Sequence, residues 1–81
     1  MNNLSESIEV QNALRELISL QDCGIAEDFK TRLNSALDRL SKAKNLKGMR
    51  EIVGPQLKFI SGHLAAVGLT PEQLIESFFP Q

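Results

Sequence analysis

The stretch from residue 27 to residue 43, EDFKTRLNSALDRLSKA, does most to decide the fold of this chain. Its apolar residues recur every three or four positions, a spacing that places them on one face of an α-helix. They are Phe29, Leu33, Ala36, Leu37, Leu40 and Ala43. Acidic residues open the stretch and lysines follow near its end, the order that the helix dipole favours. The pattern predicts an amphipathic helix that ends at Asn45 or continues to Val53.

The N-terminal section has the same helical period. A helix is predicted over residues 5–20, started by Asn3 and Glu6 in a pattern that resembles a capping box. It ends before Gly24, which permits a turn. Its apolar positions spread around more than half of its circumference and are Leu4, Ile8, Val10, Ala13, Leu14, Leu17, Ile18 and Leu20.

Proline and glycine divide the C-terminal section. Gly54-Pro55 predicts a helix boundary, because proline lacks a backbone donor and its ring clashes with the preceding turn. A helix from Pro55 is then expected to end at Gly68. The segment Thr70-Pro71-Glu72-Gln73 predicts the start of a short last helix, with Thr70 as N-cap and Gln73 as its capping-box partner.

No segment alternates polar and apolar residues, so we predict an all-α fold of four to five short helices in one domain, residues 1–81. A chain of 81 residues buries little surface and has no disulfide to support it. Phe78 and Phe79 are adjacent, about 100° apart on a helix, which suggests that one chain does not cover both. The fold is therefore either a compact bundle or an intertwined dimer, and a homodimer is expected.

Charge is distributed unevenly along the chain. Residues 1–28 hold six acidic residues and one basic residue, whereas residues 29–58 hold eight basic and two acidic residues. Oppositely charged helices are expected to lie side by side, within one chain or between two copies. A sharper interpretation is that a basic patch contacts an acidic partner; it comprises Lys42, Lys44, Lys47 and Arg50.

The residues that carry enzyme chemistry are scarce. His63 and Cys23 are the single imidazole and the single thiol, and they lie on different predicted elements. Neither a metal-ligand cluster nor a glycine-rich phosphate loop is present in the sequence, so we expect no enzyme, no metal, no cofactor and no small-molecule substrate. The apolar runs are too short to span a membrane and no signal peptide opens the chain, so a cytoplasmic protein is expected.

A DNA-binding motif fits part of the sequence. Residues 46–53 and 56–64 can be drawn as a helix-turn-helix with Gly54 at the turn. Arg50 then occupies a position that needs a small residue, and the second helix offers few polar side chains to read bases. DNA binding is therefore the alternative, rather than the preferred, interpretation.

The corner Gly68-Leu69-Thr70-Pro71, followed by Leu74, Ile75 and Ser77, resembles one in bacterial histone-like nucleoid-structuring proteins. In that family the corner joins the last two helices of the oligomerisation region. Upstream, Cys23 precedes a long helix that starts with acidic residues, as in the family plan. The resemblance implies a helical self-association module with two contact surfaces and without the family's DNA-binding domain.

These observations favour a non-enzymatic helical module for protein interaction and oligomerisation. We expect a bacterial regulatory protein that acts by binding another protein, for example by modulating a nucleoid or transcription regulator. Its expected partner surface is on the last helix and comprises Leu74, Ile75, Phe78 and Phe79. A phage- or plasmid-encoded inhibitor of a host protein fits the same pattern and remains a second alternative.

Overall fold

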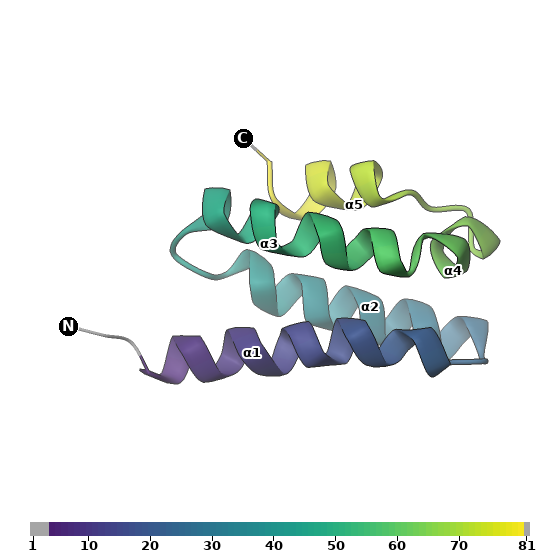
Figure 1. Ribbon diagram of the computed structural model, residues 1–81, viewed down its shortest axis with the longest axis horizontal. Helices are drawn as coiled ribbons and strands as arrows, with labels where there is room; N and C mark the ends of the chain where they lie inside the picture. The colour runs from purple at the N-terminus through teal and green to yellow at the C-terminus, as the bar shows by residue number, and fades with distance from the viewer. Residues whose placement is uncertain (1–3, 81) are drawn as a thin grey trace.

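Five α-helices and one short 3-10 helix make up the described part of the chain, residues 4–80, in a computed structural model (Figure 1). Side chains are described for residues 8–45 and 47–80. The elements are α1 (Leu4–Ser19), η1 (Leu20–Asp22), α2 (Ala26–Ser41), α3 (Leu46–Phe59), α4 (Ser61–Ala66) and α5 (Pro71–Phe78). The all-α prediction is confirmed, and no strand occurs between residues 4 and 80.

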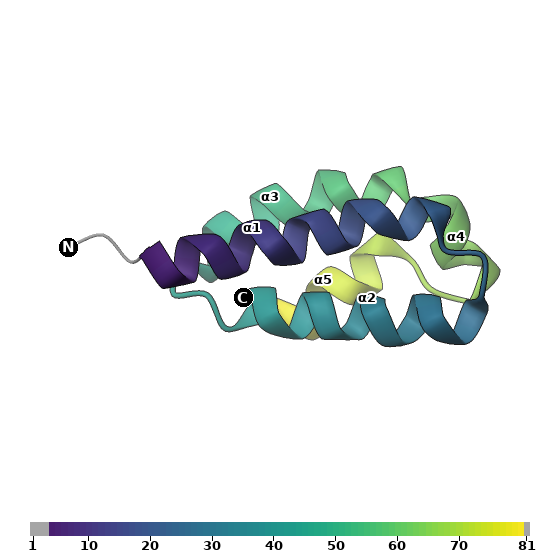
Figure 2. The same ribbon diagram turned by 90° about the horizontal axis from the view of Figure 1, so that it is seen from below.

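The helices form an elongated bundle with extents of 41 × 24 × 17 Å. α1 and α2 run antiparallel, α3 returns in the direction of α1, and α5 lies against α3 and α2 (Figures 1 and 2). Each helix turns its apolar face inward, because helices this short gain their stability from packing. Among the described side chains, the buried core comprises Ala13, Leu17, Leu20, Phe29, Leu33, Ala36, Leu37, Leu40, Met49, Val53, Leu57, Ile60, Leu64, Leu74 and Phe79.

The region between α2 and α3 shows that residues 26–53 form two helices rather than one. α2 ends at Ser41, and Asn45 is the N-cap of α3. The backbone N–H of Gly48 donates to Oδ1 of Asn45 over 2.9 Å, which satisfies one of the free donors at the helix start. The cap explains why a continuous apolar period is nevertheless interrupted here.

The predicted boundary at Gly54-Pro55 is wrong, because α3 continues through both residues to Phe59. Two features reduce the cost of this interior proline. Gly54 has no Cβ to clash with the proline ring, and Pro55 lies on the exposed side of the helix. The neighbouring Val53 and Leu57 are fully buried, so packing holds the segment helical.

The break occurs instead at Ile60, which separates α3 from α4 with φ −108° and ψ 22°. The predicted stop at Gly68 is confirmed, and its φ of +79° is one that glycine adopts without a steric penalty. The N–H of Gly68 donates to the carbonyl of Ala65 over 3.0 Å, and that of Leu69 to the carbonyl of Leu64 over 2.8 Å. These two bonds form a Schellman motif.

The capping box at α5 is confirmed in both directions. The Gln73 N–H donates to Oγ1 of Thr70, and the Thr70 N–H donates to Oε1 of Gln73, each over 3.1 Å. The similar pattern predicted for Asn3 and Glu6 lies outside the described residues and side chains. Over residues 4–80, none of the helices has the length and apolar character that crossing a membrane requires.

Candidate interaction surface

The apolar residues of α5 mostly face the protein interior. Leu74 and Phe79 are buried in the core, and Ile75 and Phe78 are half-buried against it. The prediction that these four residues form a partner surface is therefore corrected. Leu74 and Phe79 are not accessible to a partner, and only parts of Ile75 and Phe78 are exposed. One chain does accommodate both phenylalanines.

The reason is local backbone geometry at the end of α5. Phe79 is the C-cap residue, with φ −129° and ψ 60°, and the helix ends at Phe78. The rotation of about 100° between neighbouring residues applies only inside a helix. Phe79 is thus free to turn into the core although Phe78 lies at its margin.

The four residues of the predicted basic patch differ in their surroundings: one contacts α5 and three are exposed. Arg50 belongs to the fold: its Nη1 donates to the carbonyl oxygen of Phe79 over 2.9 Å, and its Nη2 lies 3.7 Å from Oε2 of Glu76. Lys42 is exposed and pairs with Asp38 at 3.3 Å, whereas Lys44 and Lys47 are exposed on the turn and on the start of α3. Arg50 is therefore engaged within the chain, and partner binding by the four basic residues stays a prediction.

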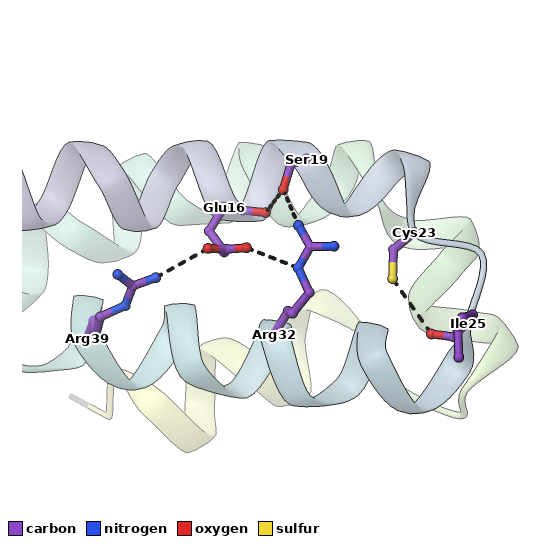
Figure 3. Close-up of polar contacts among 6 residues, drawn as sticks. All are labelled: Glu16, Ser19, Cys23, Ile25, Arg32 and Arg39. Carbon is purple, nitrogen blue, oxygen red and sulfur yellow. Dashed lines mark hydrogen bonds and ion pairs between the residues drawn. The ribbon is translucent and has the colours of Figure 1, made fainter.

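The acidic first helix meets two arginines of the second helix within the chain, consistent with the expectation that oppositely charged segments lie side by side (Figure 3). Nε of Arg32 donates to Oε2 of Glu16 over 3.0 Å, and Nη2 of Arg39 lies 3.7 Å from Oε1 of the same carboxylate. Nη2 of Arg32 also donates to Oγ of Ser19 over 2.7 Å. The Ser19 hydroxyl in turn donates to the main-chain carbonyl of Glu16, again over 2.7 Å.

This network fixes the register of α1 against α2. The hydrogen bond that Arg32 donates to the Glu16 carboxylate raises the pKa of Arg32 above its ordinary value. Nε of Arg39 is buried without a hydrogen-bond partner. Glu16 therefore has a structural role, since it is the acceptor shared by two arginines of α2.

Cys23 and His63 lie on different elements, as predicted, but both line one shallow hollow of about 300 Å³ with Phe29. The His63 ring stacks on Phe29, with centroids 5.8 Å apart and planes inclined by 20°. The Cys23 thiol donates to the carbonyl of Ile25 over 3.6 Å (Figure 3). Among the described residues, no group of three or more His, Cys, Asp or Glu side chains is placed to hold a metal ion.

The continuity of α3 also affects the DNA-binding alternative. A helix-turn-helix with Gly54 at its turn requires the chain to bend at that residue. Since α3 runs unbroken from Leu46 to Phe59, these residues do not form that motif. The helix-turn-helix drawn from the sequence, with its turn at Gly54, is therefore wrong.

An exposed strip on α3 is the most conspicuous surface feature that the sequence patterns do not single out. Phe59 is 72% exposed and Ile52 is 44% exposed. Pro55 is exposed and Gln56 half-buried, so an uncharged i, i+3, i+4, i+7 strip runs along the helix.

The neighbouring helices show which way this strip faces. Arg50, Gly54 and Lys58 line a hollow with α5, so that side of α3 faces α5. The strip lies on the other side of the buried stripe of α3, next to α1.

α1 continues the same surface. Its acidic side faces α2 through Glu16, so its opposite flank lies beside α3. That flank carries Ile18, which is 49% exposed, with the half-buried Leu14 and the exposed Gln11. We call the combined surface the α1–α3 face; it comprises Gln11, Leu14, Ile18, Ile52, Pro55, Gln56 and Phe59. No member is charged, although 23% of the chain is.

Comparison with protein-family models, with curated proteins and with solved structures finds no match to this chain.

Proposed function

We propose that this chain is a non-enzymatic protein-interaction module that binds another polypeptide through the α1–α3 face. The single observation that carries the proposal is the exposure of Phe59, at 72%, within an uncharged strip. An exposed aromatic ring is costly in water and is an anchor in many protein interfaces. The proposed role is regulatory and cytoplasmic.

The chemistry of the face supports a protein partner over a nucleic acid. Phosphate binding depends on Lys and Arg side chains, and none lies on the face. Of the four basic residues proposed as a patch, Arg50 is engaged by Phe79 and Glu76, and Lys42 pairs with Asp38. An interface core, by contrast, is apolar and aromatic and depleted of charge.

Site-specific photocross-linking tests the proposal directly. Benzoylphenylalanine at position 59 replaces one exposed aromatic side chain by another and is expected to form a discrete adduct in the cells that express the chain. The mass of the adduct, above the 9.0 kDa of the chain itself, identifies the partner as a second copy or another protein.

Ile25 provides the matched control, because it is 63% exposed but lies outside the helices and away from the face. Benzoylphenylalanine at position 25 is expected to give no discrete adduct. Absence of an adduct at position 59, or the same adduct from both positions, would overturn the proposed contact surface.

A further inference from the structure

We infer that the occupant of the α1–α3 face is a second copy of this chain, related by a two-fold axis parallel to the helices. This inference rests on the proposed function and adds the identity and orientation of the partner. In that arrangement α1 of one copy lies on α3 of the other, so the same face is used twice.

The two long edges of the face carry opposite charges. Arg15 follows Leu14 on the outer edge of α1, and Glu51 precedes Ile52 on the outer edge of α3. Both are exposed, and neither has an ion-pair partner among the described residues. Of the other charged groups nearby, Glu9 lines a hollow with α2 and Lys58 lines one with α5, whereas Asp22 is exposed in η1, past the end of α1.

These edges distinguish the two ways in which a second copy can dock. An axis parallel to the helices brings the Arg15 edge of each copy to the Glu51 edge of the other. An axis across the helices instead places α1 on α1 and α3 on α3, so that the two Arg15 edges come together, as do the two Glu51 edges. Like charges at a rim disfavour association, whereas complementary rims set its orientation. The first arrangement is therefore the one that the charges select.

The size of the face sets the expected affinity. Its apolar part consists mainly of three side chains, Phe59, Ile52 and Ile18. A stable interface covers about 800 Å² on each partner, more than three partly exposed side chains supply. The dimer is therefore expected to be weak and to dissociate on dilution.

Sedimentation equilibrium of the purified full chain, from micromolar to millimolar concentration, tests the inference. Interference optics are needed because the chain has no Trp and no Tyr. The wild type is expected to dimerise reversibly, and Phe59→Ser to remain monomeric with an unchanged helical circular dichroism spectrum. Ile25→Ser removes another highly exposed apolar side chain, outside the α1–α3 face, and is expected to leave the dimer intact.

Charge reversal tests the orientation. Arg15→Glu and Glu51→Arg are each expected to weaken dimerisation about tenfold, because two symmetric rim pairs become repulsive. The double reversal is expected to restore it to near the wild-type level. Lys30→Glu, on the exposed side of α2, is the control and is expected to have no effect.

A wild-type chain that stays monomeric at millimolar concentration overturns the inference, as does a double reversal no better than either single one. A monomeric chain that still forms an adduct with a different protein through position 59 overturns only the dimer. The proposed function then stands. If the chain neither dimerises nor forms an adduct through position 59, both the dimer and the proposed function are overturned.

Discussion

The guanidinium of Arg50 contacts the main-chain carbonyl of Phe79, a residue 29 positions away, through a 2.9 Å hydrogen bond. The bond ties the end of α5 to the middle of α3. Only 20% of the Arg50 side chain is exposed, so water competes weakly for the donor. This contact connects the last helix to the bundle by a polar bond as well as by the burial of Phe79.

Arg50→Met tests the energetic role of this hydrogen bond. The substitution keeps the apolar stem and removes the donor, so the free energy of unfolding in urea is expected to fall by about 1–2 kcal/mol. Glu76→Gln, which affects only a 3.7 Å pair with a carboxylate 74% exposed, is expected to change it by less than about 0.5 kcal/mol. Equal losses in the two variants would instead assign the effect to the ion pair.

Pro55→Ala is expected to stabilise the protein by about 1–3 kcal/mol, because it restores a backbone donor within α3 and removes the ring from the helix interior. Thermal and urea unfolding measure the change. Pro71→Ala is the control: proline suits the first position of α5, so its loss is expected to cost up to about 1 kcal/mol.

Gly54→Ala gives a second test of the same segment. In the wild type no gain is expected, because the new Cβ meets the ring of Pro55. In the Pro55→Ala background the same change is expected to stabilise α3 by about 0.5–1 kcal/mol. Additive effects in a double-mutant cycle would show that Gly54 does not relieve the proline.

Gly68→Ala is expected to destabilise the protein by about 1–2 kcal/mol, because the φ of +79° forces the new Cβ toward the following carbonyl. Gly24→Ala is the matched control in another turn, where a Cβ meets nothing within 4 Å. It is expected to be neutral or slightly stabilising, and unfolding curves of the two variants give the comparison. A neutral Gly68→Ala would mean that the Schellman turn adapts to an alanine.

Glu16→Gln removes the negative charge, and one of the two carboxylate oxygens, that Arg32 and Arg39 contact. The side chains are 34–40% exposed, so solvent screening limits the expected loss to about 1 kcal/mol, decreasing as salt is added. Asp38→Asn breaks the more exposed pair with Lys42 and is expected to cost less than about 0.5 kcal/mol. A loss for Glu16→Gln that does not respond to salt would indicate packing rather than charge.

The elements that the sequence predicts well are those that local chemistry determines. The α2 stripe, the Gly68 stop and the Thr70 capping box each depend on residues within a few positions of one another. Pro55 shows where local rules fail: its helix-breaking tendency is outweighed by burial of Val53 and Leu57 against segments distant in sequence. The sequence around Pro55 alone does not predict this packing, because the contacts come from distant parts of the chain.

The candidate site was the harder prediction for the same reason. Phe59 and Phe79 are equally apolar in the sequence, yet one is 72% exposed and the other is fully buried. The difference depends on where α3 and α5 end and on which neighbours cover them. Arg50 likewise reads as a surface cation until α5 is placed beside it.

The four phenylalanines occupy four distinct environments: Phe29 stacked on His63, Phe59 in solvent, Phe78 at the core margin and Phe79 inside it. Uniform labelling with fluorophenylalanine should therefore give four separate ¹⁹F resonances without any mutation. One of them senses the His63 ring, one reports on contacts made at the surface, and two follow the docking of the last helix. A single spectrum thus follows internal packing and external association at once.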